Sequence, residues 1–93
     1  MYKLIFTFSY EEKAKKFIKK HPELKKQYSK ILELIKLNPY HLSLRIHQFK
    51  TTSFEGYSVS INLSYRIALD FLITEKEITF VNIGDHQEIY GKK

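Results

Sequence analysis

Apolar and polar residues alternate along the second half of the chain with the period of a β-strand. The alternation covers residues 57–62 and 65–73, and a third short apolar segment follows at 78–83. Successive side chains of a strand point to opposite faces, so the first two segments each have one apolar face and one smaller, more polar face. The pattern therefore predicts three consecutive antiparallel strands, around which the domain is organised.

The first half of the chain predicts one strand and two amphipathic helices. Residues 2–8 alternate and are rich in β-branched and aromatic side chains, which favours a strand. Apolar residues then recur at helical spacing up to about Lys20, and again from about Glu23 to Leu37. We expect an antiparallel helical hairpin with its apolar faces on the sheet and its lysines in solvent.

Local signals mark the ends of these helices. Ser9 and Glu12 have the spacing of a capping box, in which each side chain binds the other residue's backbone amide. Pro22 disfavours a helical residue before it and is a good first residue for the second helix. Asn38 and Pro39 end that helix.

A further strand is expected at residues 42–49, followed by a polar loop at 50–56. The predicted fold class is α+β: an N-terminal strand, a two-helix antiparallel hairpin, then a three- to four-stranded antiparallel sheet. Residues 1–93 form a single domain, since this length supports one modest core. The helices should cover one face of the sheet and leave a polar concavity on the other.

Composition narrows the class of protein. The chain has no cysteine, which excludes disulfides and thiolate metal sites and fits a reducing cytoplasm. No apolar run approaches the roughly 18 residues that a membrane span needs, and no signal peptide opens the chain. We therefore expect a cytoplasmic protein without a membrane partner.

The net charge of +6 is concentrated in the helical half. Residues 1–37 contain ten lysines and four glutamates, whereas residues 38–93 are balanced. A basic face of this kind attracts polyanions over about 8–10 Å at physiological salt. The alternative is that the lysines only solvate exposed helix faces.

Arg66 is the most informative single residue. It lies in the middle of an apolar strand on the more polar side, where a charge is costly without a partner. The partner is either a bound phosphate or an acidic side chain. Asp70 is a poor choice, because four residues along a strand span about 13 Å.

Three other side chains are candidates for acid–base chemistry. His86 follows the last strand, and its ordinary pKa suits proton transfer near neutral pH. His47 lies in the strand expected at 42–49 and meets His86 and Arg66 if the strands assemble on one face. Tyr90 can donate a phenolic proton or stack on a base. Asp85 either orients His86 or has a local turn role, and His21 and His41 are expected on the surface.

The sequence does not favour a metal or cofactor site. The four histidines are scattered and lack the spacing of a metal-binding motif. A Ser-His-Asp triad stays open in principle, although no nucleophile elbow is present. With three glycines, the chain has no glycine-rich phosphate loop. We expect no metal and no cofactor.

The order of these segments resembles the RelE/ParE superfamily of bacterial toxins, most closely its YafQ/YoeB-like mRNA interferase branch. The resemblance covers nearly the whole chain. Its motifs are Leu-x-x-His-x-Phe, Gly-Tyr-Ser-x-x-Ile-x-x-x-Tyr-Arg-Ile and Ile-Gly-x-His-x-x-Ile-Tyr. The resemblance implies a metal-independent endoribonuclease that cleaves mRNA at the ribosome and inhibits translation. It also implies a cognate antitoxin, and contact with operator DNA only through the antitoxin complex.

Carried over by position, the resemblance implies that Arg66 binds the scissile phosphate and that His86 is an acid or base. It implies that His47 is a second catalytic histidine and that Tyr90 positions the RNA. Basic residues are expected to bind RNA and the ribosome: Lys13, Lys16, Lys20, Lys26, Lys30, Arg45 and Lys50.

The chain departs from the family pattern at several positions. Ser58 and Ser60 stand where many relatives have basic residues, and Asp85 and Gln87 replace the usual Thr and Asp. Two alternatives therefore stay open. One is a ParE-like DNA gyrase inhibitor without catalysis. The other is a degenerate, non-toxic member that binds an antitoxin.

Overall fold

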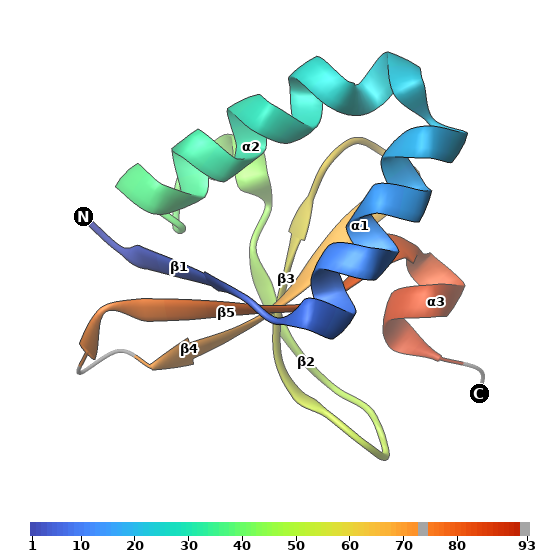
Figure 1. Cartoon of the computed structure of the whole chain (residues 1–93). Coiled ribbons are helices and arrows are strands. Elements are labelled where there is room, and N and C mark those ends of the chain that lie inside the picture. Colours follow the sequence, from blue (N-terminus) through green and yellow to red (C-terminus); the bar gives the residue numbers. More distant parts are fainter. Residues whose placement is uncertain (73–74, 92–93) are drawn as a thin grey trace.

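The computed structural model describes residues 1–72 and 75–91, and Figure 1 shows the arrangement of its elements. In chain order these are β1 (Lys3–Phe6), α1 (Phe8–Lys20), the 3₁₀ turn η1 (Pro22–Leu24), α2 (Lys25–Leu37), the 3₁₀ turn η2 (Leu42–Leu44), β2 (His47–Lys50), β3 (Glu55–Ser60), β4 (Tyr65–Leu72), β5 (Glu77–Asp85) and α3 (His86–Tyr90). The predicted α+β class is confirmed.

The five strands form one mixed sheet in the order β1-β5-β4-β3-β2. Neighbours from β2 to β5 are antiparallel, as the sequence predicts. The N-terminal strand adds to this set in parallel with β5, with Lys3 opposite Glu77 and Phe6 opposite Phe80. The predicted strand end at Ile73 and the turn residue Thr74 lie outside the described residues.

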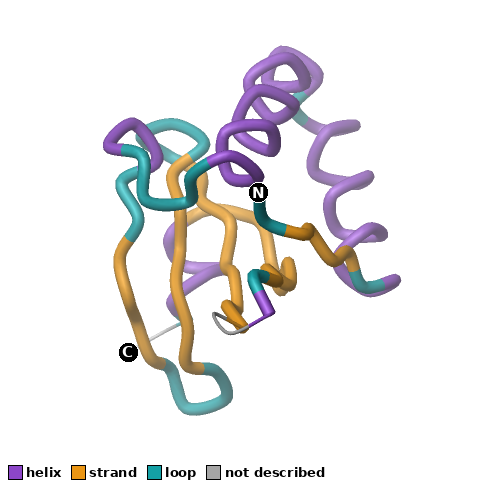
Figure 2. Tube along the Cα trace, turned by 90° about the vertical axis from the view of Figure 1, so that its left-hand side faces the viewer, coloured by secondary structure: helices purple, strands orange, loops and turns teal. Residues whose placement is uncertain are grey.

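Helices α1 and α2 lie together on one side of the strands (Figure 2). Their apolar stripes pack on the sheet face formed by alternate residues of β3, β4 and β5. Tyr10 and Tyr28 join the two helices through a hydroxyl–hydroxyl hydrogen bond of 2.9 Å. The buried core consists of Tyr10, Ala14, Phe17, Ile31, Ile35, Leu44, Val59, Ile61, Ile67, Leu69, Ile78, Phe80 and Ile83. Residues between these along β3 and β4 therefore face the opposite side of the sheet, which carries the candidate site.

The start of α1 differs from the prediction. Thr7, not Ser9, is the N-cap, and its hydroxyl accepts a hydrogen bond from the amide of Tyr10 at 3.1 Å. Strand β1 ends at Phe6, so Thr7 is the first residue whose extended backbone precedes the helix, and Ser9 already lies in its first turn. The predicted capping box of Ser9 and Glu12 is therefore wrong.

The segment predicted as a strand at 42–49 is a strand only from His47 onward. Residues Leu42–Leu44 form a 3₁₀ turn, which begins where the His41 ring accepts a hydrogen bond from the amide of Ser43 at 3.2 Å. Arg45 then takes a left-handed backbone conformation, with φ of 48°. This reversal turns the carbonyl of Arg45 toward β4, which matters for the site below.

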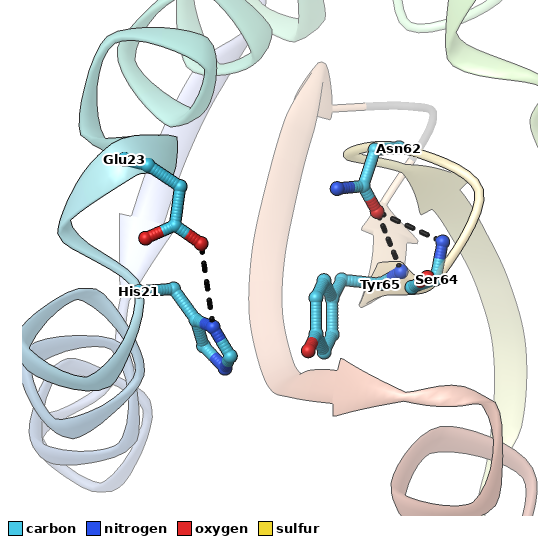
Figure 3. Close-up of polar contacts among 5 residues, drawn as sticks. All are labelled: His21, Glu23, Asn62, Ser64 and Tyr65. Atoms are coloured by element: carbon cyan, nitrogen blue, oxygen red, sulfur yellow. Dashed lines mark hydrogen bonds and ion pairs between the residues drawn. The ribbon is translucent and has the colours of Figure 1, made fainter.

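Two groups of contacts hold the end of the sheet near the connection between α1 and α2 (Figure 3). Asn62 Oδ1 accepts hydrogen bonds from the amides of Ser64 and Tyr65, both at 2.9 Å, and so fixes the β3–β4 turn. The His21 ring packs on Tyr65, with centroids 4.7 Å apart, and lies 3.7 Å from the carboxylate of Glu23. His21 is half-buried, so its expected surface position is wrong, whereas His41 is exposed as expected.

Candidate active site

The side chain of Arg66 lies on the sheet face opposite α1 and α2 and is only 6% exposed. Its Nε donates to Ser58 Oγ at 2.9 Å. Its Nη2 donates to the carbonyls of Arg45 at 2.6 Å and Ser58 at 3.1 Å. The left-handed Arg45 supplies the shortest of these contacts. The guanidinium is thus fixed by neutral oxygen atoms.

Within residues 1–72 and 75–91, no carboxylate forms an ion pair with Arg66. The ion pair found among these residues joins His21 and Glu23. Asp70, the acid considered from sequence, is exposed on β4 and does not pair with Arg66. Burial lowers the pKa of Arg66, but a guanidinium stays protonated in proteins. The sequence alternative of a structural ion pair is therefore wrong, and an uncompensated positive charge lies in the sheet face.

One edge of the guanidinium remains available. Among the described residues, Nη1 of Arg66 makes no hydrogen bond, and no buried side-chain nitrogen or oxygen lacks a partner. Nη1 must therefore reach solvent, where its two N–H groups can bind an anionic oxygen.

Ser58 joins Arg66 to two further polar side chains. It is fully buried on β3, with its Oγ 2.7 Å from the hydroxyl of Tyr90 and 3.4 Å from Nε2 of His47. The strand register explains this arrangement. His47 on β2 is the direct partner of Ser58, and Arg66 on β4 is its diagonal neighbour on the same face.

His47 and Tyr90 form the exposed side of the cluster. The Tyr90 hydroxyl lies 2.8 Å from Nε2 of His47, and the two rings stack with an interplanar angle of 18°. Nδ1 of His47 lies 3.4 Å from Nη2 of Arg66. The two hydrogens of Nη2 are directed at the carbonyls of Arg45 and Ser58, so this longer contact does not fix the tautomer of His47.

The pKa of His47 is lowered from its ordinary value of 6.5. Partial desolvation of the ring is the largest cause, followed by the positive charges of Arg66 and His86. Neutral imidazole is the form that can accept a proton, so these neighbours keep His47 ready to act as a base at neutral pH.

His86 lies at the rim of the cluster as the first residue of α3. The helix begins with a capping box in which Asp85 Oδ1 accepts from the amide of Glu88, and Glu88 Oε1 from that of Asp85, both at 2.8 Å. Asp85 thus positions the whole of α3. The ring of His86 is exposed, 5.8 Å from that of Tyr90, and makes no hydrogen bond with the described residues.

The predicted basic residues fall into two groups. Lys13 and Lys50 line a pocket of about 820 Å³ beside Tyr90. Lys13, Lys16 and Lys20 line a second pocket of about 680 Å³ between α1 and α3. Both pockets share Lys13, Asn82 and Glu88, so they form one continuous basic surface.

The remaining basic residues are not part of this surface. Lys26 and Lys30 are exposed on α2 and line neither pocket. The Arg45 side chain is exposed, and the residue contributes to the cluster through its backbone carbonyl.

Sequence reasoning expected His47 to meet Arg66 and His86 on one face; His47 does lie beside Arg66, whereas His86 lies at the rim with its ring 5.8 Å from that of Tyr90. It did not foresee the contacts of Tyr90 and Ser58 with this pair. It treated Ser58 as the loss of a basic residue. The feature of the sequence that could have revealed its role is that Ser58 lies two residues before Ser60, so both point to the polar face of β3. Only the register reveals that its hydroxyl is shared by the other three side chains.

Within the described residues, no group of three or more His, Asp or Glu side chains is placed to hold a metal ion. No helix of residues 1–72 and 75–91 is long and apolar enough to cross a membrane. The expectation of a metal-free, cofactor-free site stays a prediction.

Comparison with known proteins gives matches to solved structures. No protein-family model matches the chain, and no curated protein matches its sequence. YafQ from E. coli strain BL21(DE3) superposes with a TM-score of 0.76 at 12% identity, over 98% of this chain and 100% of that one. The YoeB/ParE toxin from Agrobacterium tumefaciens gives 0.72 at 14% identity, over 90% and 98% of the two chains.

A third structure is the E. coli DinJ-YafQ toxin-antitoxin complex, with a TM-score of 0.74 at 15% identity, over 97% and 98% of the two chains. The protein described here therefore has the YafQ/YoeB-like fold of the RelE superfamily toxins. This confirms the fold that the sequence resemblance implies.

Proposed function

We propose that this chain is the toxin of a toxin–antitoxin pair and acts as a metal-independent endoribonuclease that cleaves mRNA at the ribosome. The observation that carries the proposal is the buried Arg66, whose charge no described carboxylate balances, beside a neutral histidine. A phosphodiester supplies the missing negative charge. The toxin-like fold supports the same reading.

The cluster has the groups that metal-free RNA cleavage requires. A base removes the proton of the ribose 2′-hydroxyl, whose oxygen attacks the phosphorus. The bond to the 5′-oxygen breaks, and an acid protonates that leaving oxygen. The products are a 2′,3′-cyclic phosphate and a 5′-hydroxyl. General acid and base groups each contribute about 10²–10⁴-fold to such a reaction.

The geometry suggests an assignment of roles. His47 is the base, because its pKa is lowered and its Nδ1 lies beside Arg66. Arg66 binds the phosphate through Nη1 and stabilises the charge that develops there. His86 is the acid, because its exposed ring is free of hydrogen bonds to the described residues. Tyr90 is held between Ser58 and His47 and stacks on the RNA.

The basic surface between α1 and α3 extends the site. Lys13 and Lys50 line the pocket that includes Tyr90, and Lys13, Lys16 and Lys20 line the adjoining pocket; these lysines bind the RNA backbone on either side of the cleaved bond. Lys26, Lys30 and Arg45 are assigned to the ribosome, since they are exposed outside these pockets.

A cognate antitoxin is the proposed protein partner. One similar structure is a toxin-antitoxin complex, DinJ-YafQ. The chain carries a net charge of +6 and an unbalanced Arg66 in its candidate site. An antitoxin with an acidic segment over this site would neutralise both and block RNA. Operator DNA is contacted through that complex.

The test is inducible expression in a bacterium with mapping of mRNA 5′ ends. Wild type is compared with Arg66→Ala/His86→Ala and with a control, Lys3→Gln/Lys25→Gln, which changes two exposed lysines that line neither pocket. We expect growth arrest with new in-frame cuts, lost in the first variant and retained in the control.

Two outcomes contradict the proposal. Arrest without cuts points to a protein target such as DNA gyrase, and supercoiling assays then decide. The absence of arrest from soluble protein points to a degenerate member. That second reading draws on Ser58 and Ser60, at which the chain departs from the family pattern that the sequence resembles.

A further inference from the structure

The hydroxyl of Ser58 is the one atom in the cluster that lies within hydrogen-bond distance of all three candidate catalytic side chains around it. Nε of Arg66, the hydroxyl of Tyr90 and Nε2 of His47 lie at 2.9, 2.7 and 3.4 Å. The residue is fully buried, so it cannot itself touch a substrate.

We propose that Ser58 is a positioning residue that sets the orientation of the Arg66 guanidinium and of the Tyr90 phenol. The inference rests on the proposed nuclease function, which it deepens by assigning a residue that acts through two others. Ser58 is not a degenerate remnant of a basic position.

The effect on Arg66 follows from the hydrogen bonds of its guanidinium. Nη2 already binds two backbone carbonyls, those of Arg45 and Ser58. Both bonds hold one end of the group. The contact from Nε to Ser58 Oγ is the hydrogen bond that holds its Nε edge. Nη1 then points in one direction, toward the solvent side.

A basic residue at position 58 would be incompatible with this arrangement. Its charge would lie in a fully buried position directly beside another buried cation, without a carboxylate within the described residues. A hydroxyl is small, neutral and both donor and acceptor. The site thus uses one well-oriented cation where several basic residues would otherwise share the phosphate.

Ser58 also orients Tyr90, because the Oγ that accepts from Arg66 is hydrogen-bonded to the Tyr90 hydroxyl. The Tyr90 hydroxyl lies 2.8 Å from Nε2 of His47 and 2.7 Å from Ser58 Oγ. The Ser58 contact holds the phenol nearly parallel to the His47 ring, with an interplanar angle of 18°. Without it, the Tyr90 hydroxyl loses its contact with a buried partner on β3.

The experiment compares Ser58→Ala with Ser60→Ala. Ser60 is a matched control because it lies two residues along the same strand and is also buried, but its hydroxyl binds the carbonyl of Asn62. Two NMR signals report on the cluster without requiring activity. These are the exchange rate of the Arg66 Nε–H proton and the titration of the His47 ring.

In wild type and Ser60→Ala we expect slow exchange of the Arg66 Nε–H proton. In Ser58→Ala we expect exchange at least tenfold faster and a shifted His47 titration. For RNA cleavage we expect kcat to fall by about 10²-fold with little change in KM, the size expected when a catalytic group is misplaced by about 1 Å.

The outcomes separate the two proposals. If wild type cleaves no RNA, the nuclease proposal fails, while the NMR signals still test Ser58. Unchanged exchange and titration in folded Ser58→Ala overturn the positioning role. Should Ser58→Ala not fold, Ser58→Cys decides, since a thiol fills the position of the hydroxyl with a somewhat larger atom that accepts hydrogen bonds weakly. Intermediate exchange then supports the role, and wild-type exchange overturns it.

Discussion

At the scale of single residues, the site is defined by how Arg66 is held. It donates to two carbonyls and a hydroxyl and lies 3.4 Å from Nδ1 of His47, and no carboxylate is among these contacts. A buried charge without a counter-ion lowers the stability of the fold, so the presence of Arg66 at this position calls for a functional reason. Binding a phosphate provides one, because the anion restores neutrality at Nη1 and is attracted more strongly in a partly desolvated site than in water.

This reasoning predicts that inorganic phosphate stabilises wild type and leaves Arg66→Met unaffected. A ligand that binds only the folded state at a hundred times its Kd adds about 2.7 kcal/mol to the free energy of unfolding. Thermal unfolding at increasing phosphate, with ionic strength held constant by chloride, measures the effect. Phosphate also stabilises proteins non-specifically. An equal rise in Tm for both proteins would therefore show that Arg66 is not the anion site.

At the scale of elements, the sheet register brings the cluster together. Residues 47, 58 and 66 come from three neighbouring strands, and Tyr90 of α3 reaches the hydroxyl of Ser58. Alternation and helical spacing predicted α1, α2 and the strands β3 to β5, because burial of one face imposes these periods, but they did not predict the short helix α3. They could not supply the register, which depends on pairing between distant segments, and so the shared hydroxyl of Ser58 was missed.

Local capping was a second failure at this scale. Both Thr7 and Ser9 are good N-cap residues, and Glu12 three residues after Ser9 favoured the latter. What decided between them was where β1 ends, which its parallel pairing with β5 sets. Likewise, the turn before β2 depends on the burial of Leu44, a tertiary contact that alternation does not encode.

The cap gives a direct prediction. Thr7→Ala removes the acceptor of the Tyr10 amide and should lower the free energy of unfolding by about 1 kcal/mol. Ser9→Ala changes an exposed residue of the first helical turn and should change it by less than about 0.5 kcal/mol. Urea unfolding of the two variants beside wild type measures both. A larger loss in Ser9→Ala would restore the capping box predicted from sequence.

At the scale of the whole molecule, the positive charge is divided between two surfaces. Lys16 and Lys20 on α1 line the pocket between α1 and α3, which shares Lys13, Asn82 and Glu88 with the pocket that includes Tyr90. Lys26 and Lys30 on α2 are equally exposed but lie outside both pockets. Net charge alone attracts any polyanion, whereas a surface joined to the site also guides one strand through it. The two pairs therefore separate general attraction from specific contact.

We predict that the two lysine pairs differ in their effect on binding of a short single-stranded RNA. Each phosphate contact contributes about −0.7 to the slope of log K against log salt. Lys16→Gln/Lys20→Gln should therefore make the slope shallower by about 1.4, and Lys26→Gln/Lys30→Gln should leave it close to wild type. Both variants lose two positive charges, so each controls for net charge in the other. Fluorescence anisotropy between 50 and 300 mM salt, roughly the range over which such slopes are resolved, measures both. Equal slopes in the two variants would mean that RNA follows the overall field of the protein, and the surface between α1 and α3 would lose its assignment as the RNA path.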